Sequence, residues 1–424
     1  MALGTDVDHR PSLRKSFRWT FAANGINAAC QWGMIASFAK LGNAEDVGRY
    51  ALGLAVSAPV ISLASLHLAA VQATDAQGEY RFQDYFSARI ITTIAACLVI
   101  SMVAMISARD TSSAWIIVLV GLIKGLESLS EIVRSLFQKH ERMPLSASSL
   151  LIKGLGSLSI ASVGYWMTGQ LSVVLGLVAL FVACVVGFFD LPHAVRLLRQ
   201  SMPGQDTRFA LTSFSPRTIW SVMTRAFPLG IGIFLLTLQN NIPRYFLTGV
   251  HGNKALGYFT AMAYLSVLGT FVVSALGQAA APRLSVFHVD NPLAYRRLLF
   301  RLLGLGAVMG IAYVIAVVTV GPIAMSFLYR PEYAQFHREF IVIALSGAIS
   351  FVTFFCGYGL VATRIFRSQL VAGILGSTAG AVIAFLLVPS HGLLGAGITL
   401  LATSMITLAC YLAGVRSALR AVDL

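Results

Sequence analysis

Four charged side chains lie within an otherwise apolar run of the sequence, AWIIVLVGLIKGLESLSEIVRSLFQKH. They are Lys124, Glu127, Glu131 and Arg134, and their spacing of three, four and three residues places them on one narrow face of a helix. Lys124 lies about ten residues into the run, or ~15 Å at the helical rise per residue. Such groups can bind an ionic substrate, carry a proton or neutralise one another.

Two interpretations of this charged face are open. Lys124 with Glu127 and Glu131 with Arg134 could form two ion pairs buried between helices. Alternatively, the face lines a water-filled path for a substrate, which we favour. A face turned to lipid is disfavoured, because ionisable groups inside a membrane are costly and usually face a cavity or a partner.

Other apolar runs also carry polar residues that could contact a substrate. Asn24, Asn27 and Gln31 share one helical face by their spacing of three and four. The favoured role for these residues is hydrogen bonding between helices. The alternative is that they line a cavity wall that contacts a sugar. Arg225 lies ~10 Å into a further run, and Lys153 lies near the end of another, where its long side chain can reach the membrane surface.

The stretch LQNNIPRYFLTG places polar residues at the end of a long apolar run. Pro243 removes a backbone donor and is expected to weaken the last helical turn, while Asn240 and Asn241 can satisfy the freed backbone groups. Arg244 then lies where it can reach lipid phosphate or an anionic substrate. These residues complete the set of substrate-binding candidates.

Three residues are candidates for coupling transport to an ion gradient: Glu127 and Glu131 of the charged face, and His67. His67 is more often a packing residue than a proton carrier at such a position. Pro59 is expected to kink the apolar run 47–71, which also contains His67.

The elements that carry these residues must be membrane-spanning helices. Hydrophobic residues make up 57% of the 424 and charged residues 11%, with a mean hydropathy of +0.78, whereas soluble domains carry about 25% charged residues. Because a spanning helix needs roughly 20 apolar residues, we predict an all-α polytopic membrane protein with about twelve spans: 17–40, 47–71, 87–107, 114–138, 146–167, 171–190, 220–248, 255–280, 298–320, 339–363, 369–388 and 393–416. Runs such as AVIAFLLV do not alternate between apolar and polar residues, as the strands of a membrane β-barrel would, which disfavours a β-barrel.

The basic residues predict the orientation. Of 31 Lys and Arg residues, 20 fall on the side of the N-terminus, 7 on the opposite side and 4 inside spans. Positive-inside bias therefore places both termini in the cytoplasm. The net charge of +14 follows mostly from this topology and from anionic lipid; no nucleic-acid motif accompanies it.

The chain divides into two halves. A basic stretch at residues 191–218 separates six spans in residues 1–190 from six in residues 219–424. VGRYALGLAVSAPV in the first half and LGYFTAMAYLSVL in the second open equivalent spans about 209 residues apart, from Gly48 to Gly257. An internal duplication is indicated, with the two copies related by an axis along the membrane normal.

Other chemistries have little support in the sequence. The five cysteines, Cys30, Cys97, Cys184, Cys356 and Cys410, lie in apolar runs without metal-site spacing, and we expect small buried side chains rather than disulfides or a metal site. The basic N-terminus precedes a run that is too long and too polar for a cleaved signal, which predicts a retained first helix. No cofactor is expected.

Three stretches of this sequence resemble the second half of Wzx-type flippases for lipid-linked oligosaccharides. They are FPLGIGIFLLTLQNNIPRYFLTG, LGYFTAMAYL and SALGQAAAPRLS. These flippases belong to the polysaccharide-transport branch of the MOP superfamily, which is MATE-like. VGRYALGLAVSAPVISLASLHLAAVQATDA resembles the first half, and NIPRY at 241–245 is the most telling motif. The resemblance covers nearly the whole chain.

The resemblance implies two six-helix bundles in a V and alternating access of a central cavity. It implies an undecaprenyl-pyrophosphate-linked oligosaccharide as cargo, moved across the bacterial inner membrane for O-antigen or exopolysaccharide biosynthesis. Membrane lipids, a polysaccharide polymerase and chain-length proteins are the implied partners, with no nucleic acid. The basic groups in the spans suit a pyrophosphate, because guanidinium groups bind phosphate oxygens in pairs.

Two other functions are open. A MATE-type exporter of drugs or cations would share the fold, and Glu127 and Glu131 suit cationic cargo. A membrane-embedded glycan polymerase or ligase would need a substantial loop outside the membrane and catalytic carboxylates or a Ser/His/Asp arrangement, neither of which is evident.

Overall fold

The described part of the chain is helical almost throughout. The computed structural model describes residues 13–74, 80–107, 110–201, 215–363 and 367–420. The first half contains α1 (Leu13–Leu41), α2 (Ala44–Ser65), α3 (Leu68–Thr74), α4 (Phe82–Ser107), α5 (Thr111–Lys139), α6 (Met143–Thr168), α7 (Leu171–Val185), the π-helical turn η1 (Val186–Asp190) and α8 (Leu191–Ser201). The second half contains α9 (Pro216–Asp290), α10 (Pro292–Leu328), the 3-10 turn η3 (Pro331–Phe336), α11 (His337–Ala362) and α12 (Arg367–Arg420).

The helices have the length and apolarity of membrane spans. Eight described helical segments meet both requirements, which confirms the predicted all-α, multi-pass membrane fold. α9 and α12 are each bent at one glycine with non-helical backbone angles, Gly252 (φ 81°, ψ −177°) and Gly392 (φ 53°, ψ −123°). Because each bend separates two predicted spans, α9 and α12 each contain two of them; the total of twelve stays a prediction.

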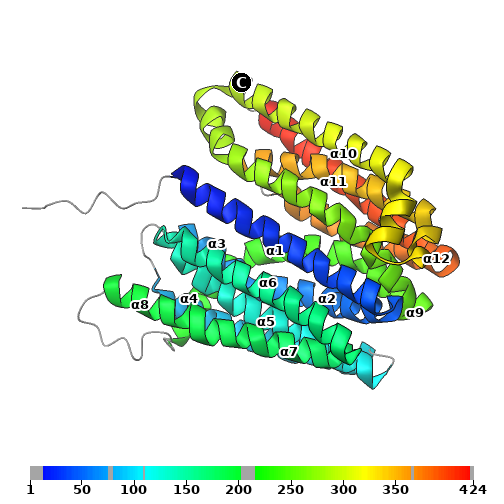
Figure 1. The fold of residues 1–424 in the computed structure, drawn as a ribbon. Helices are drawn as coiled ribbons and strands as arrows, with labels where there is room; N and C mark the ends of the chain where they lie inside the picture. The colour runs from blue at the N-terminus through cyan, green and yellow to red at the C-terminus, as the bar shows by residue number, and fades with distance from the viewer. Residues whose placement is uncertain (1–12, 75–79, 108–109, 202–214, 364–366, 421–424) are drawn as a thin grey trace, which may run out of the picture.

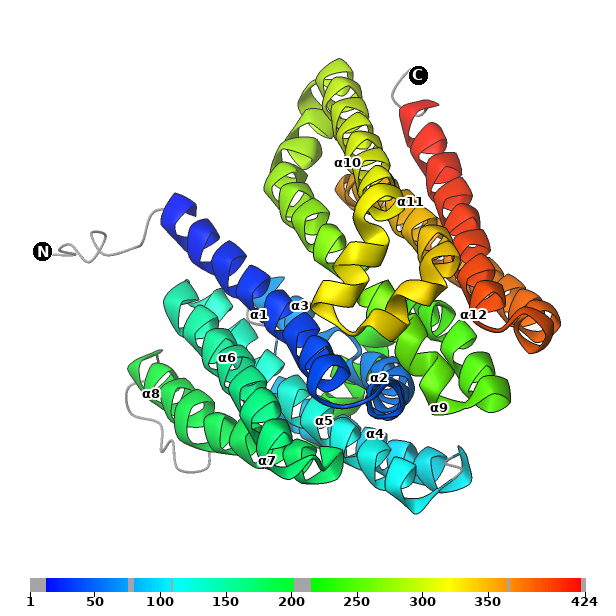
Figure 2. The same ribbon diagram turned by 45° about the vertical axis from the view of Figure 1, so that its right-hand side comes forward.

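The two halves of the chain form two groups of helices, as both views show (Figures 1 and 2). In the first group α1 packs on α6, and α5 packs on α2, α4 and α7. In the second group α11 packs on α9, α10 and α12, while α9 also packs along α2. Of the predicted linker at 191–218, the first part forms α8, and residues 202–214 lie outside the described residues.

The groups meet where α2 crosses α9 at two glycines. A Cβ atom on Gly48 would lie 1.7 Å from the carbonyl oxygen of Asn253, and one on Gly257 would lie 1.8 Å from that of Ala44. Small residues allow helix backbones to approach in this way inside membranes. Ala44 and Asn253 are separated by the same offset as the two glycines, so the crossing repeats itself about an approximate two-fold axis. This symmetry supports the internal duplication.

Several hydrogen bonds join the groups near this crossing. Lys40 Nζ donates to the carbonyl oxygen of Phe327 at 2.6 Å, and the Arg330 guanidinium donates to that of Lys40 at 3.3 Å. Asn253 Nδ2 donates to Ser113 Oγ at 3.3 Å. We call this region, defined by Lys40, Gly48, Ser113, Asn253, Gly257 and Arg330, the closed end. It lies opposite the end at which α1 begins and α12 ends (Figure 2).

The cysteines are less uniformly buried than predicted. Cys30 and Cys356 are buried, Cys97 and Cys410 are partly buried, and Cys184 is exposed. All five are free thiols. The expectation of burial is therefore wrong for Cys184, whose position on α7 turns it away from the packed core.

Asp110 caps the N-terminus of α5 close to the closed end. Its side chain accepts a hydrogen bond from the Ser113 backbone nitrogen at 3.1 Å. Hydrogen bonds from Ser113, first from its side chain and then from its backbone, lower the pKa of the Asp110 carboxyl. A depressed folded-state pKa stabilises the protein above the unfolded pKa, and this stabilisation is lost as the pH falls through the folded pKa.

Asp110→Ala is expected to lower the free energy of unfolding by about 1 kcal/mol at neutral pH, the usual effect of losing an N-cap. Thermal unfolding in detergent at a series of pH values would measure this. Asp110→Asn is the control, because asparagine caps about as well as aspartate without titrating. If the loss of unfolding free energy in Asp110→Ala stayed constant from neutral to acidic pH, the contribution of the Asp110 carboxyl to stability would not depend on its ionisation.

Candidate functional site

A small polar pocket lies between α1, α5 and α6. Its volume is about 140 Å³, and its lining consists of Asn27, Cys30, Gln31, Met34, Glu127, Arg134, Leu150, Lys153, Gly154 and Ser157. The polar residues share helical faces because they are spaced four or seven residues apart on each helix, and α1 packs directly on α6. The fold thereby brings four predicted candidates together from three helices: Asn27, Gln31, Glu127 and Lys153. We call this the α1–α5–α6 pocket.

Lys124 forms an ion pair at the edge of this pocket. Its Nζ lies 2.8 Å from Glu127 Oε2, and both side chains stay partly exposed, at 25% and 38%. This is one of the two ion pairs considered from the sequence. The partial exposure of both side chains leaves this pair accessible to a ligand that enters the pocket.

The second predicted pair does not form. Glu131 pairs with Arg89 of α4 instead of Arg134, with Arg89 Nη2 and Glu131 Oε2 3.7 Å apart. The Arg89 side chain is fully buried and also donates from Nη1 to Ser128 Oγ at 3.1 Å. Arg89 is one of the 20 basic residues that were predicted to lie on the side of the N-terminus. However, α4 begins at Phe82, so Arg89 lies two turns inside a helix.

Lys153 belongs to a buried network that also contains Ser130 and Asp190. Its Nζ lies 3.2 Å from Asp190 Oδ2 and contacts Ser130 Oγ, which donates to Asp190 Oδ2 at 2.5 Å. The Lys153 and Asp190 side chains are 6% and 0% exposed. Lys153 therefore does not reach the membrane surface. Asp190 was not a candidate from the sequence; it ends the π-helical turn η1, and such turns are frequent at functional sites.

The polar cluster of the seventh predicted span is helical throughout. α9 continues past Pro243, so the expected weakening does not end the helix there. Asn241 donates from Nδ2 to the carbonyl oxygen of Thr237 at 2.8 Å and accepts from Arg244 Nη1 at 3.0 Å. Tyr264 lies near both Arg244 and Lys124. These two candidates, one from each half of the chain, therefore lie in the same region of the molecule.

The remaining candidates lie apart from the α1–α5–α6 pocket. Asn240 lines a second pocket, between α9, α11 and α12. Asn24 is half-buried on α1. His67 is exposed in the break between α2 and α3, where its φ is +55°, so it is not the packing residue expected. Arg225 is part of α9, but its side chain lies outside the described part of the chain.

Comparison with known proteins identifies the family. Residues 13–288 match the family described as "Polysaccharide biosynthesis protein", which is more than half of the chain. The chain belongs to this family. It is 25% identical over 402 residues to the capsular polysaccharide biosynthesis protein CapF of Staphylococcus aureus, a match that covers 94% of this chain and 98% of CapF. The resemblance drawn from the sequence is therefore confirmed at the level of the family.

Solved structures show the fold that this member of the family adopts. An inward-facing multidrug resistance MATE transporter of the MOP superfamily matches with a TM-score of 0.70 and 12% identity, over 94% of this chain and 95% of that one. The lipid II flippase MurJ in an inward closed conformation also has a TM-score of 0.70, with 11% identity over 95% of this chain and 89% of that one. At such low identities these matches concern the fold alone, and they confirm it as MATE-like.

Proposed function

We propose that this protein moves an undecaprenyl-pyrophosphate-linked oligosaccharide from the cytoplasmic to the outer leaflet of a bacterial inner membrane. The product would serve O-antigen or exopolysaccharide biosynthesis. Membership of the polysaccharide biosynthesis family supports a polysaccharide precursor as cargo. The MATE-like fold, which a lipid II flippase shares, supports translocation rather than catalysis.

The observation that carries the proposal is a pair of embedded arginines without acidic partners. Among the described residues, Arg134 and Arg244 form no ion pair, and the Nε atom of each is buried without a hydrogen-bond partner. A cation held in this way inside a membrane is costly unless an anion joins it. The guanidinium group offers paired donors that match phosphate oxygens. A diphosphate that passes between the halves would supply the missing partner to each arginine in turn.

The closed end suggests the order of events. Positive-inside bias assigns the terminus-bearing end, opposite the closed end, to the cytoplasm, so the protein in this conformation would load its cargo from there. The diphosphate and glycan would occupy the polar interior while the polyprenyl chain stays in lipid. Cargo shifts the conformational equilibrium only if its affinity differs between the two states. Opening the closed end would require the α2–α9 crossing to separate.

The pairing of the embedded carboxylates favours a flippase over an exporter of cations. Glu127 pairs with Lys124, Glu131 with Arg89 and Asp190 with Lys153. Each carboxylate already has a cationic partner, so a cationic drug would have to displace it. In a null strain, a flippase predicts accumulation of unflipped lipid-linked oligosaccharide on the cytoplasmic side. Unchanged lipid-linked pools together with drug sensitivity would favour the exporter.

Arg244→Ala is expected to reduce transport of the lipid-linked oligosaccharide in reconstituted vesicles about 10- to 100-fold. Hydrogen bonds to charged groups contribute about 1.5–3 kcal/mol, and 1.4 kcal/mol is a factor of ten. Lys124→Ala should reduce transport in the same direction. Arg244→Lys should recover only part of it, because an ammonium group lacks the paired donors.

Arg297→Ala is the matched control, since Arg297 is an exposed arginine of α10. It should transport like the wild type. Undiminished transport in both Arg244→Ala and Lys124→Ala would contradict capture of the diphosphate by these cations.

A further inference from the structure

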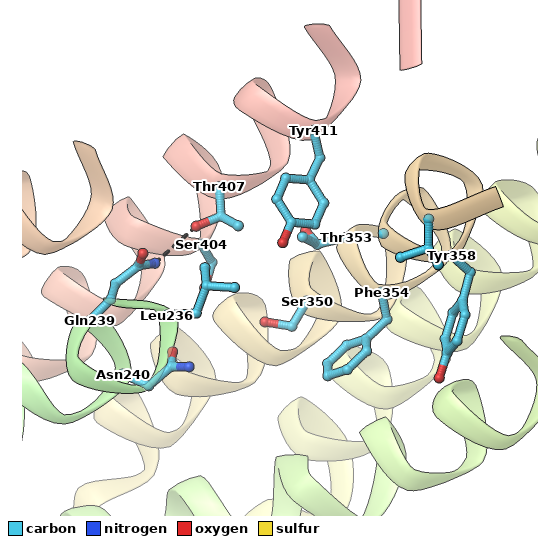
Figure 3. Close-up of a pocket in the computed structure, with 12 residues that line it drawn as sticks. Leu236, Gln239, Asn240, Ser350, Thr353, Phe354, Tyr358, Ser404, Thr407 and Tyr411 are labelled. Carbon is cyan, nitrogen blue, oxygen red and sulfur yellow. Dashed lines mark hydrogen bonds between the residues drawn. The ribbon is translucent and has the colours of Figure 1, made fainter. Parts of the chain in front are cut away.

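The second half contains a pocket of its own that none of the charged candidates lines. Its volume is about 360 Å³, within the range of about 300–1,000 Å³ typical of small-molecule sites. The lining comes from α9, α11 and α12 (Figure 3): Leu236, Gln239, Asn240, Ser350, Thr353, Phe354, Gly357, Tyr358, Val361, Ser404, Thr407 and Tyr411. We call it the α9–α11–α12 pocket.

Its polar groups are hydroxyls and amides. Of the described residues that line the pocket, none is charged. This composition argues against a diphosphate or a metal ion as occupant, because each requires opposite charge when desolvated. It also differs from a surface that faces lipid, because hydroxyl and amide groups in hydrocarbon need partners.

One amide in the pocket is rigidly held and incompletely bonded. Gln239 Nε2 donates to Thr407 Oγ1 at 2.9 Å and to the carbonyl oxygen of Thr403 at 3.3 Å. Its Oε1 is buried without a hydrogen-bond partner. Gly376 makes room for this amide, because a Cβ there would lie 2.1 Å from Gln239 Oε1. The amide group is thus fixed in place, and its oxygen packs against α12 at Gly376.

Hydroxyl groups and aromatic rings surround the remaining space. The hydroxyls of Ser350 and Thr353 donate to backbone carbonyl oxygens of α11, those of Ser346 and Ile349, at 2.9 Å each. Their oxygen lone pairs can still accept hydrogen bonds. Tyr411 reaches from α12 toward these two hydroxyls (Figure 3). The rings of Phe354, Tyr358 and Tyr411 add apolar faces to the lining. Such a mixture suits a ligand with apolar C–H faces and many hydroxyl groups.

The position of the pocket connects it to the proposed diphosphate site. Asn240 lies one helical turn before Arg244 on α9, a rise of ~6 Å. In a lipid-linked oligosaccharide the first sugar is bonded directly to the diphosphate, and the next sugars follow it. A diphosphate at Arg244 therefore brings the sugars within reach of the pocket.

We propose that the α9–α11–α12 pocket is a binding site for uncharged sugar residues, with Gln239, Asn240, Ser350, Thr353 and Tyr411 as the polar contacts. This inference rests on the proposed function for its physiological cargo. The site itself requires only that sugars bind there, with or without a lipid.

The test uses a double variant, Ser350→Ala with Thr353→Val, in the full-length protein. Its matched control is Ser285→Ala with Thr319→Val. These two residues lie on exposed helix faces, and their hydroxyls likewise donate to backbone carbonyl oxygens of the preceding helical turn. Two readouts are needed. The first is binding of the free oligosaccharide, released by mild acid from the lipid-linked pool of the producing cell, to purified protein by ligand-observed NMR. The second is vesicle transport of the lipid-linked oligosaccharide and of undecaprenyl diphosphate without sugar.

We expect the pocket variant to lose saturation transfer to the free oligosaccharide and to transport the glycosylated lipid about tenfold more slowly. Transport of the sugar-free lipid should not change, and the control should match the wild type in all three measurements. Equal loss for both lipids, or retained sugar binding, would overturn the sugar site. If the wild type binds the sugar but moves neither lipid, the proposed function fails while the sugar site stands.

Discussion

Gly48→Leu is expected to destabilise the protein severely and to abolish transport. A Cβ at position 48 would lie 1.7 Å from the carbonyl oxygen of Asn253, and this atom belongs to a helix backbone that cannot rotate away. The crossing of α2 and α9 would have to separate, with loss of the contacts around it. Overpacking of a side-chain core costs about 1–3 kcal/mol, and we expect at least the upper value here. Thermal unfolding of purified protein in detergent measures the effect.

The same substitution elsewhere provides the control. Gly176→Leu on α7 meets no heavy atom within 4 Å and should be close to neutral. Gly257→Leu should resemble Gly48→Leu, because its Cβ would meet the carbonyl oxygen of Ala44 at 1.8 Å. A Gly48→Leu protein as stable as the wild type would show that the two backbones are not in contact.

Lys153→Met is expected to lower the free energy of unfolding by about 3–5 kcal/mol, the usual effect of removing one partner of a buried ion pair. The substitution keeps the volume of the side chain but leaves the fully buried Asp190 carboxylate without its cation. Thermal unfolding in detergent would detect the loss. Adding Asp190→Asn should restore most of the stability, since the unpaired charge is then removed.

Lys124→Met serves as the comparison for Lys153→Met. Lys124 is 25% exposed and pairs with a partly exposed glutamate, so we expect a change in stability below about 1 kcal/mol. The loss of Lys124 should instead reduce the rate of transport.

The Lys153 prediction has its own contradicting outcome. If the double variant Lys153→Met with Asp190→Asn were as unstable as Lys153→Met alone, the unpaired Asp190 carboxylate would not be the cause of the instability.

Local periodicity was enough to predict much of this molecule. Long apolar runs require helices across a membrane, because only intrahelical bonds satisfy the backbone there. The spacing of Asn27 and Gln31, and that of Glu127 and Arg134, placed each pair on one face of its helix, since 3.6 residues make one turn. Both faces do line the α1–α5–α6 pocket. The offset from Gly48 to Gly257 likewise predicted two related spans, which cross each other in the structure.

Partners on different helices were decided only by tertiary packing. Glu131 could have paired with Arg134 one turn away, yet the position of α4 brings Arg89 to it. Lys153 could have reached the membrane surface, but the π-helical turn places Asp190 beside it. The α9–α11–α12 pocket combines Asn240 with hydroxyls more than 100 residues away in the chain. The sequence determined which residues share a helix face, because that depends on neighbours three and four positions apart. Which faces meet depends on how helices rotate and cross, and the packing of the whole chain sets that.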